Sequence, residues 1–313
     1  MKALYCRIEK NCCGGADNMI GTEFFRGQGF GNQLFCYVAA RCVAEDGGHV
    51  FATAGQEHFG APRWNKKGAY FMDINLGVGA KKTDFSAVYE EAQERLFLET
   101  SEHDKMYGCD VRGYDENLPR VPDGTLILGN MQSERYFAHR RGDIKKWLKV
   151  RPEYDSMELS SDDLCVINMR GGEYAGLKEL FLERDYWLKG MDNMKKINPG
   201  MRFVVVTDDL KTARKVLPEI PARHGDLAAD YVSIKNARYL LLSNSSFAFF
   251  PAFTSDTVKY IIAPKYWARH NVSDGYWSTA QNIYAGWHYQ DRAGELCTGQ
   301  ECILELEKYK RNI

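Results

Sequence analysis

The sequence predicts an α/β protein made of two Rossmann-like domains that face each other. In the second half of the chain, apolar runs typical of buried strands alternate with helical patterns, an order that favours parallel strands joined by crossover helices. In the first half, an apolar run precedes a glycine-rich turn that opens a long helical pattern. With 313 residues, the chain is long enough for about two domains of ordinary size.

The first domain is predicted to begin with a strand at residues 3–8. An extra loop over about 9–26, rich in Cys, Gly, Asn and Asp at its start, separates this strand from the glycine-rich turn at 27–33. The turn opens a helix to about residue 45, in which apolar residues recur every four positions. The other elements predicted here are a strand at 49–52, a helix near 85–95, a strand at 125–128 and a helix at 133–149.

The second domain has clearer patterns. Its run Phe-Val-Val-Val-Thr at 203–207 is nearly continuous in β-branched residues, as expected of a strand covered on both faces. The predicted strands lie at 164–169, 203–207, 231–234 and 260–263, and the predicted helices at 183–197, 210–217, 236–242 and 245–253. Because Arg151-Pro152-Glu153 interrupts the pattern before them, we predict one domain over 1–155 and another over 156–313.

Charge and apolar patterning narrow the classes of function. Lys and Arg number 41 against 42 Asp and Glu, for a net charge of −1, which gives no general electrostatic attraction to nucleic acid. We therefore expect no nucleic-acid partner. No apolar run reaches the ~18 residues of a membrane span, and charged residues at 7, 9 and 10 interrupt any secretory signal. These patterns predict a cytoplasmic protein without a membrane span.

The nine cysteines agree with a reducing compartment. Their number is odd, and several lie inside apolar patterns, where a free cysteine is a small buried hydrophobe. They lack the C-x-x-C pairs of zinc sites, so no metal site is predicted.

The first candidate site is the loop Gly27-Gln28-Gly29-Phe30-Gly31-Asn32-Gln33 before the first predicted helix. Its glycines allow a tight turn and close backbone approach, and the helix N-terminus behind it favours an anion. We take Gly29, Gly31, Asn32 and Gln33 as candidate substrate-binding residues. An ordinary glycine-rich turn explains the same spacing, which lacks the full G-x-G-x-x-G pattern.

The second candidate follows the predicted strand at 164–169, at the sheet edge where open α/β sheets bind ligands. Asn168 lies near the end of the strand, and Arg170 precedes two glycines and Glu173. The fork of donors on an arginine at this edge suits a diphosphate. Alternatively, Arg170 is a surface residue paired with Glu173 or Glu179.

Two further polar groups follow later apolar runs. Asp208 and Asp209 come after the next buried strand and are able to accept hydrogen bonds from a base or a ribose, although an Asp in this place more commonly caps the following helix. Asn244, Ser245 and Ser246 stand at a predicted helix start, where they either cap the helix or present hydroxyl and N–H groups to a phosphate.

These four motifs, in this order, resemble those of the α-1,2-fucosyltransferase family in the wider fucosyltransferase superfamily. The family's glycine-rich loop corresponds to 27–35, its His-x-Arg-Arg-Gly-Asp-Tyr motif to 168–174, its Ser/Thr-Asp-Asp strand end to 204–209 and its Ser-Asn-Ser-Ser/Thr-Phe motif to 243–250. The resemblance spans roughly residues 21–264 of the chain.

The resemblance implies two Rossmann domains of the GT-B type, in which the second domain binds GDP-fucose and the first helps to bind a glycan acceptor. It also implies inverting transfer without a metal or another cofactor. Arg170 would contact the β-phosphate and Asp209 the guanine, and Ser245 and Ser246 would contact phosphate or ribose.

The chain departs from the family pattern at the sugar-nucleotide motif. Asn168 stands where the family has His, Gly171 where it has the second Arg, and Glu173 where it has Asp. The resemblance therefore implies GDP-fucose or another GDP-sugar as the donor, and a non-catalytic relative that binds nucleotides or glycans is the remaining alternative. Glu179 lies close to where some relatives carry a glutamate that acts as the general base, and Glu173 is the second candidate for that role.

Overall fold

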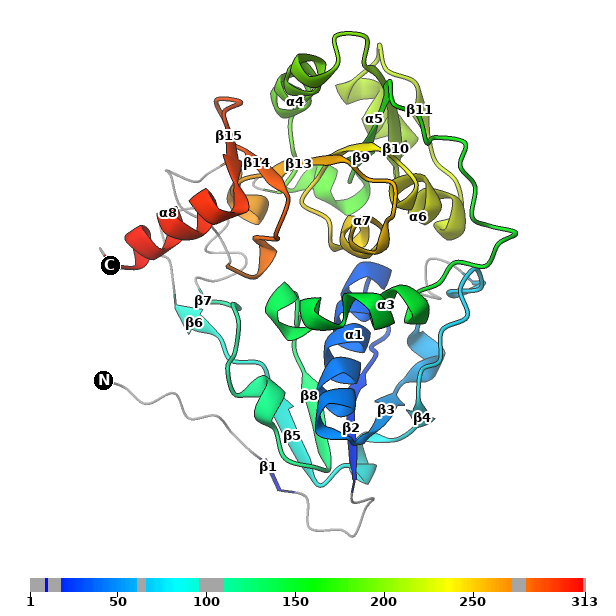
Figure 1. The fold of residues 1–313 in the computed structure, drawn as a ribbon, viewed down its shortest axis with the longest axis vertical. Helices are drawn as coiled ribbons and strands as arrows, with labels where there is room; N and C mark the ends of the chain where they lie inside the picture. Colours follow the sequence, from blue (N-terminus) through cyan, green and yellow to red (C-terminus); the bar gives the residue numbers. More distant parts are fainter. Residues whose placement is uncertain are drawn as a thin grey trace. The chain divides into compact units, whose positions relative to one another are not determined.

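The computed structural model describes residues 9–10, 18–60, 66–95, 110–178, 180–271 and 280–311. The chain divides into two compact units (Figure 1). The described residues of unit 1 fall within Met1–Glu94 and Arg112–Arg151, and those of unit 2 within Arg95–Val111 and Pro152–Ile313. The sequence places the division after residue 155, whereas the structure changes from unit 1 to unit 2 after Arg151.

Unit 1 is built around a six-stranded sheet in the order β1-β5-β8-β2-β3-β4. All neighbouring strands are parallel except β1 and β5. Its strands are β1 (Glu9–Lys10), β2 (Met19–Glu23), β3 (Val50–Ala54), β4 (Val78–Gly79), β5 (Ala87–Glu90) and β8 (Thr125–Leu128), and its α-helices are α1 (Phe30–Gly47) and α3 (Arg141–Trp147). The 3-10 helices are η1 (Gln56–His58), η2 (Lys82–Asp84), η3 (Leu118–Arg120), η4 (Glu134–Tyr136) and η5 (Ala138–Arg140). A separate ribbon pairs β6 (Glu94–Arg95) with β7 (Asp110–Val111).

β2 is an inner strand of this sheet, and the sequence analysis did not predict it. Its first four residues are buried, it pairs in parallel with β3 and β8, and it ends shortly before the glycine-rich turn. The extra loop expected over 9–26 is therefore wrong. Gly21 interrupts the short apolar run, and the sheet requires it because an added Cβ would lie 2.2 Å from the carbonyl oxygen of Ala52. The strand predicted at 3–8 lies outside the described residues.

The other predictions for unit 1 have mixed outcomes. The helix that follows the glycine-rich turn is confirmed as α1, and two predicted strands are confirmed as β3 and β8. The helix predicted near 85–95 is wrong, because this stretch forms β5 and β6. β5 has the alternating burial of a strand, but four residues are too few for that period to outweigh the helix-forming residues around it. Over 133–149, only α3 is α-helical, after the turns η4 and η5.

Unit 2 is built around a seven-stranded sheet in the order β11-β10-β9-β12-β13-β14-β15. All neighbours are parallel except β14 and β15. The strands are β9 (Leu164–Met169), β10 (Arg202–Thr207), β11 (Ala222–Arg223), β12 (Tyr239–Leu242), β13 (Tyr260–Pro264), β14 (His288–Gln290) and β15 (Leu296–Thr298). The α-helices are α4 (Arg184–Ile197), α5 (Leu210–Val216), α6 (Leu227–Lys235), α7 (Phe249–Thr254) and α8 (Gly299–Arg311). The 3-10 helices are η6 (Gly172–Gly176), η7 (Ser246–Ala248), η8 (Trp267–Arg269) and η9 (Ala280–Asn282).

The structure reverses two predicted elements of unit 2. The strand predicted at 231–234 belongs to α6, and the helix predicted at 236–242 is wrong because Tyr239–Leu242 forms β12. Asp226 caps α6 by accepting a hydrogen bond from the Ala229 N–H at 3.1 Å. β12 lies between two parallel neighbours and is apolar throughout, and such a short apolar run has no period that separates strand from helix. The predictions for β9, β10, β13, α4 and α5 are confirmed.

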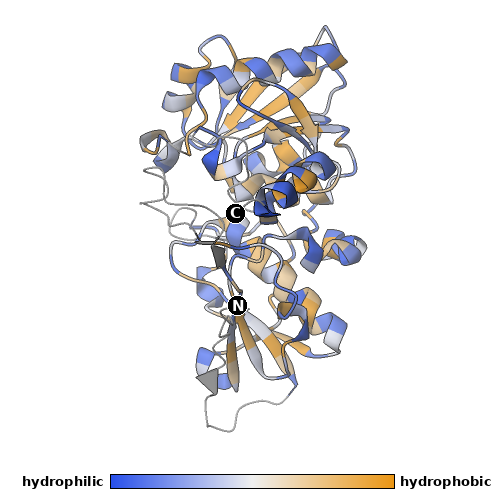
Figure 2. Ribbon diagram, turned by 90° about the vertical axis from the view of Figure 1, so that its left-hand side faces the viewer, coloured by the Kyte–Doolittle hydropathy of each residue, from blue (hydrophilic) through white to orange (hydrophobic). Residues whose placement is uncertain are grey.

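One buried cluster of unit 2 lies between this sheet and the helices α4 and α5. Trp187, Met191 and Met194 of α4 belong to the same buried cluster as Cys165 and Ile167 of β9. Figure 2 shows hydrophobic colouring along the strands of this sheet and mixed colouring on the surrounding helices. Both units are thus Rossmann-like α/β structures, which confirms the predicted fold class, while the placement of one domain opposite the other stays a prediction.

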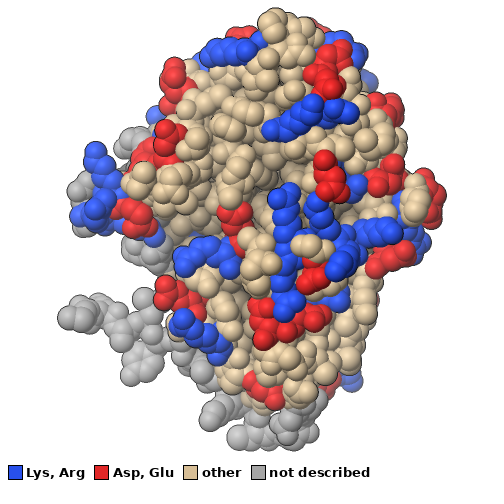
Figure 3. Space-filling model, in the orientation of Figure 1, with Lys and Arg blue, Asp and Glu red and all other residues tan. Residues whose placement is uncertain are grey.

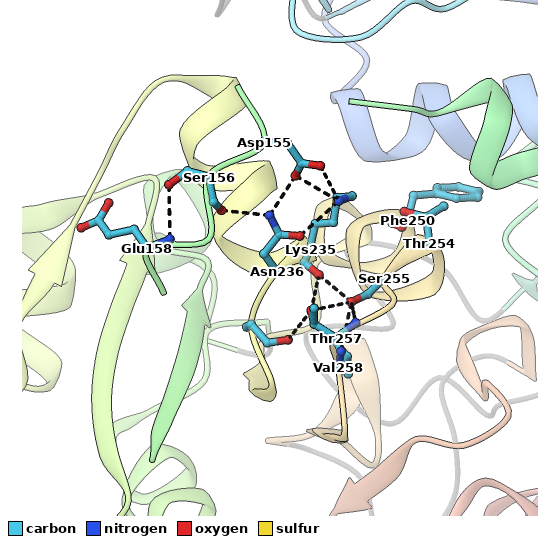
Figure 4. Close-up of polar contacts among 11 residues, drawn as sticks. Asp155, Ser156, Glu158, Lys235, Asn236, Phe250, Thr254, Ser255, Thr257 and Val258 are labelled. Carbon is cyan, nitrogen blue, oxygen red and sulfur yellow. Dashed lines mark hydrogen bonds and ion pairs between the residues drawn. The ribbon is translucent and has the colours of Figure 1, made fainter. Parts of the chain in front are cut away.

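Two polar features lie away from the sheet edges. The segment after Arg151 is fastened to the end of α6, where Asp155 accepts hydrogen bonds from Lys235 Nζ at 3.0 Å and Asn236 Nδ2 at 2.8 Å (Figure 4). On unit 1, Lys and Arg side chains gather over α3 (Figure 3). Neighbouring carboxylates, Asp46 and Asp143 among them, pair with several of these basic groups. The expectation of no nucleic-acid partner stays a prediction.

Within the described ranges, no helix is both long enough and apolar enough to cross a bilayer. The predicted cytoplasmic location is not tested by this observation and stays a prediction.

Candidate functional site

The order of the strands in unit 2 creates a natural binding edge. Counted along the chain, its first five strands lie in the order third, second, first, fourth, fifth, so that β9 has the second strand on one side and the fourth on the other. The chain therefore leaves β9 and β12 in opposite directions. Open α/β sheets bind ligands in the crevice at the carboxyl ends of such a strand pair.

Arg170 follows the last residue of β9 and is held by carboxylates. Its Nη1 donates to Asp208 Oδ2, and its Nη2 donates to Glu173 Oε1 at 3.1 Å. The guanidinium carbon lies 5.4 Å from the centre of the Tyr174 ring, within the range of a cation–π contact. The sequence-level alternative, in which Arg170 pairs with Glu173, is therefore observed together with a second pair that the sequence did not predict.

The register of the sheet brings Arg170 and Asp208 together. β9 and β10 are parallel neighbours that pair Met169 with Thr207, so the two charged residues are the next positions of both strands. The Gly171 N–H also donates to Asp208 Oδ1 at 2.7 Å. Asp208 thus bridges a side chain and a backbone group of consecutive residues.

Asp209 caps α5. Its Oδ1 accepts from the backbone N–H groups of Lys211 at 3.0 Å and Thr212 at 3.2 Å, and its Oδ2 accepts from Thr212 Oγ1 at 2.6 Å. The hydrogen bonds from Thr212 lead the causes that lower the pKa of this carboxyl below its ordinary value. A carboxylate has about four acceptor positions, so Asp209 keeps room for about one more donor. The capping role is observed, and contact with a base stays a prediction.

Three buried polar atoms at this edge have no hydrogen-bond partner within the described part of the chain. They are Asn168 Oδ1, Ser243 Oγ and Asn244 Oδ1, on residues that are 7%, 1% and 3% exposed. The pairing of β9 with β12 brings these three residues together. Asn168 pairs with Leu242, and the carbonyl oxygen of Asn168 accepts a hydrogen bond from the Ser243 N–H at 2.9 Å. An unsatisfied buried polar atom costs about 1–3 kcal/mol, so three at one edge indicate a place that water or a ligand completes.

The remaining candidates of unit 2 lie on either side of these atoms. Asn244 Nδ2 donates to the Leu180 carbonyl oxygen at 2.9 Å, which ties the start of η7 to the segment after η6. Ser245 Oγ caps η7 by accepting from the Phe247 N–H at 3.4 Å, and Ser246 is the first residue of that turn. Glu179 lies outside the described residues, so its predicted role as a base is not placed.

The glycine-rich loop lies at the corresponding edge of unit 1, between the end of β2 and the start of α1. Gly29 is the N-cap of α1 and Gly31 lies in its first turn. Asn32 Oδ1 accepts from Gln132 Nε2 at 3.1 Å. The buried amide of Gln33 is engaged at both ends, since it donates to the His58 carbonyl oxygen at 2.7 Å and accepts from the Gly60 N–H at 2.8 Å. Substrate binding by these four residues stays a prediction, and the contacts of Gln33 are structural.

Sequence reasoning missed two buried titratable groups. Glu91 follows β5 and accepts from the Asn130 N–H at 2.8 Å, the Met131 N–H at 2.9 Å and the Tyr136 hydroxyl at 3.0 Å, while burial raises its pKa. It holds the turn after β8. His270 follows η8 and is 3% exposed. Neither Glu91 nor His270 directly follows a predicted strand, so no local pattern marks them, and Ser243 follows a run that the sequence predicts as a helix.

No group of three or more His, Cys, Asp and Glu side chains in the described ranges has an arrangement that could hold a metal ion. The edge of unit 2 offers instead one guanidinium, three carboxylates and neutral amide and hydroxyl groups. Such groups are able to form hydrogen bonds with the phosphate, ribose and base of a nucleotide. The expectation of a reaction without a metal or cofactor stays a prediction.

Comparison with known proteins gives one curated relative and several structures. No model of a known protein family matches the chain. An α-1,2-colitosyltransferase of Escherichia coli is 25% identical over 188 residues, a stretch that covers 52% of this chain and 64% of that protein. Over this stretch the chain is similar to a glycosyltransferase. The matched stretch spans less than two thirds of the relative's length, and the α-1,2 linkage stays a prediction.

Two solved structures match the chain with TM-scores below 0.5 and at low sequence identity. The fucosyltransferase NodZ from Bradyrhizobium is 12% identical with a TM-score of 0.43, over 80% of this chain and 95% of that one. A family 9 glycosyl transferase from Veillonella parvula is 9% identical with a TM-score of 0.45, over 95% of this chain and 98% of that one.

Proposed function

We propose that this protein is a glycosyltransferase that moves a sugar from a GDP-sugar donor to a hydroxyl group of a glycan, with L-fucose as the first candidate sugar. The donor would bind to unit 2. The transfer would invert the anomeric carbon and would need neither a metal nor another cofactor. The curated relative, named for transfer of colitose, supports the class of reaction.

One observation carries the proposal: the carboxyl ends of β9 and β12 carry both Arg170 and the unpartnered atoms of Asn168, Ser243 and Asn244. The guanidinium suits a diphosphate, and the buried amide and hydroxyl groups suit the uncharged hydrogen-bonding groups of a nucleoside. These groups would be enough for a protein that binds a nucleotide without catalysing transfer.

Catalysis would use the same arginine. The acceptor oxygen forms a bond to the anomeric carbon while the bond from that carbon to the β-phosphate oxygen breaks, and GDP leaves with the electron pair. Negative charge therefore grows on the β-phosphate, where Arg170 would stabilise it. A charge-assisted hydrogen bond of ~1.5–3 kcal/mol, if made mainly in the transition state, supplies roughly 10- to 200-fold in rate.

Inversion also needs a base that takes the proton of the acceptor hydroxyl, a contribution of ~10²–10⁴ in rate. Glu179 and Glu173 are the candidates for this role. Glu173 is 67% exposed at its side chain and pairs with Arg170, so it is free to move when an anion takes its place.

The donor sugar has a second candidate, because two of the three departures from the fucosyltransferase motif change groups that could contact the donor. Gly171 removes the second arginine of the motif, and Asn168 replaces its histidine. The curated relative is named for a sugar other than fucose. We therefore include other GDP-sugars among the donors to be tested.

Calorimetric titration with GDP, UDP and ADP tests the donor site. We expect GDP to bind at least ~10-fold more tightly, because one of its N1–H and amino donors suits the acceptor position that Asp209 keeps and its carbonyl suits the Asn168 amide. UDP lacks that donor pair and would leave this remaining acceptor position unmatched, at about 1–3 kcal/mol. Arg170→Ala should weaken all three diphosphates alike, and Asp209→Ala should narrow the preference for GDP.

The control for Asp209→Ala is Asp226→Ala, which removes a similar helix cap from α6. It should leave the nucleotide preference unchanged. Equal affinity for the three nucleotides, or a preference for UDP, would contradict the proposed donor. GDP binding without transfer to any glycan from any GDP-sugar would favour the non-catalytic alternative.

A further inference from the structure

The pair between Asp208 and Arg170 is built into the turn that follows β9. Asp208 receives the Arg170 guanidinium on one oxygen and the Gly171 N–H on the other. A cation and a backbone donor thus fix the carboxylate from two directions. Its side chain is 29% exposed, against 67% for Glu173, the other partner of Arg170.

The two glycines of the turn are required for this contact. An added Cβ on Gly171 would lie 2.9 Å from Cβ of Asp209, and one on Gly172 would lie 2.6 Å from Oδ2 of Asp208. Gly172 also has a positive φ of 40°. A side chain at Gly171 would press against the Cβ of Asp209, and one at Gly172 would displace the Asp208 carboxylate from Arg170. The glycine that replaces the second arginine of the related motif therefore gives up one cation and gains a close backbone approach to Asp208.

The charge around Arg170 then limits how a diphosphate enters. Asp208 and Glu173 contact the guanidinium, and Asp209 lies next in the chain. These two contacts use two of the five N–H donors of the guanidinium, and a phosphate that binds at the Nη2 side takes the place of Glu173. Glu173 is the exposed one and is held by Arg170 alone among the contacts described for its side chain. Asp208 has the additional backbone donor and stays.

We propose that Asp208 is a positioning residue that holds Arg170 for the β-phosphate, and that Glu173 is the exchangeable anion that the phosphate displaces. This inference rests on the proposed binding of GDP. It predicts opposite effects for the two carboxylates on one guanidinium. Loss of the Asp208 charge leaves Arg170 free to turn toward Glu173, whereas loss of the Glu173 charge removes a competitor of the phosphate.

The test is calorimetric titration of the full chain with GDP and with GMP, which lacks the β-phosphate. We expect Asp208→Asn, which keeps an acceptor for the Gly171 N–H, to weaken GDP about tenfold and to leave GMP within about twofold. We expect Glu173→Gln to tighten GDP about two- to fivefold, the scale of an exposed ion pair. The unchanged GMP affinity separates positioning from a general loss of structure.

The matched control is Asp163→Asn. Asp163 also pairs with an arginine, accepting from Arg202 Nε at 2.8 Å and Nη2 at 3.1 Å, but at the opposite edge of the same two strands. Asp163→Asn should change the affinity for neither GDP nor GMP. Tighter GDP binding by Asp208→Asn would show that Asp208 competes with phosphate, and an equal loss for GMP would show a structural role; either result overturns the inference. If the unmodified chain and Asp163→Asn bind no GDP, the proposed function fails instead.

Discussion

His270 is a buried histidine on the loop after β13. Its ring meets Tyr186 edge-on at 5.1 Å between ring centres, and its side chain contributes an unpartnered Nδ1 within the described residues. Burial lowers its pKa to about 4, and the positive charges of Arg292 and Lys189 act in the same direction while Asp291 opposes them. The folded protein therefore holds a neutral imidazole here at pH 7.

This histidine should make stability depend on pH. An unfolded histidine has a pKa of about 6.5, so the unfolded chain binds a proton that the folded chain rejects until the pH nears 4. The contribution is fully present above pH ~6.5 and is lost as the pH falls through the folded pKa, by up to about 3 kcal/mol. His270→Phe should lose this dependence, as measured by urea unfolding at pH 7.5, 6.0, 5.0 and 4.5.

The exposed His139→Phe serves as the control for that measurement, because its ring lies at the surface beside Asp46. The free energy of unfolding of His270→Phe minus that of the unmodified chain should rise as the pH falls, and it should rise more than the same difference for His139→Phe. Parallel curves of unfolding free energy against pH for all three proteins would contradict the lowered pKa of His270.

At the scale of elements, β2 shows how closely neighbouring backbones approach in unit 1. Gly21 pairs with residues of both β3 and β8. A Cβ added to it would lie 2.2 Å from the Ala52 carbonyl oxygen and 2.8 Å from the Phe85 ring. A backbone oxygen in a paired strand has little freedom to move. The strand therefore accepts glycine alone at this position without a shift of the sheet.

Gly21→Ala should lower the free energy of unfolding by about 2–3 kcal/mol through overpacking. Gly142→Ala is the matched control in the same unit, because its added Cβ meets nothing within 4 Å and it lies inside α3. There alanine should raise stability by about 0.5–1 kcal/mol through its higher helix propensity. Denaturant unfolding of both variants measures the difference. Equal stabilities would mean that β2 adjusts more freely than its contacts indicate.

At the scale of the whole molecule, the chain is two compact units with separate sheets, and the candidate donor site uses residues of unit 2. A ligand stabilises the part that binds it by mass action, about 2.7 kcal/mol at a concentration of 100 Kd. The stabilisation need not be shared by the rest of the chain. Binding can therefore be located by asking which strands gain protection.

We expect GDP to slow hydrogen exchange in β9 and β12 more than in β2 and α1, and to do so equally in the presence of EDTA. The EDTA arm follows from the prediction of binding without a metal. Peptide-resolved exchange with and without GDP provides the measurement. Protection confined to unit 1 would move the site, and protection that EDTA removes and manganese restores would contradict the metal-free proposal.

The sequence by itself determined the elements whose pattern is local. β9, α4, β10 and α5 follow from an apolar strand, an amphipathic helix and a second β-branched strand, each long enough to show its period. The positions of Asn168, Arg170 and the aspartate pair at strand ends followed from the same local pattern. So did the glycine-rich turn before α1.

Only the tertiary structure decided what depends on neighbours far along the chain. The four apolar residues of β12 form a strand because β9 and β13 supply its hydrogen bonds, and β2 is buried because β3 and β8 enclose it. The pairing of Arg170 with Asp208 could not be predicted from the sequence for the same reason. The guanidinium meets Asp208, 38 positions later, because parallel strands end in register, and no local period of a sequence encodes the register between two strands.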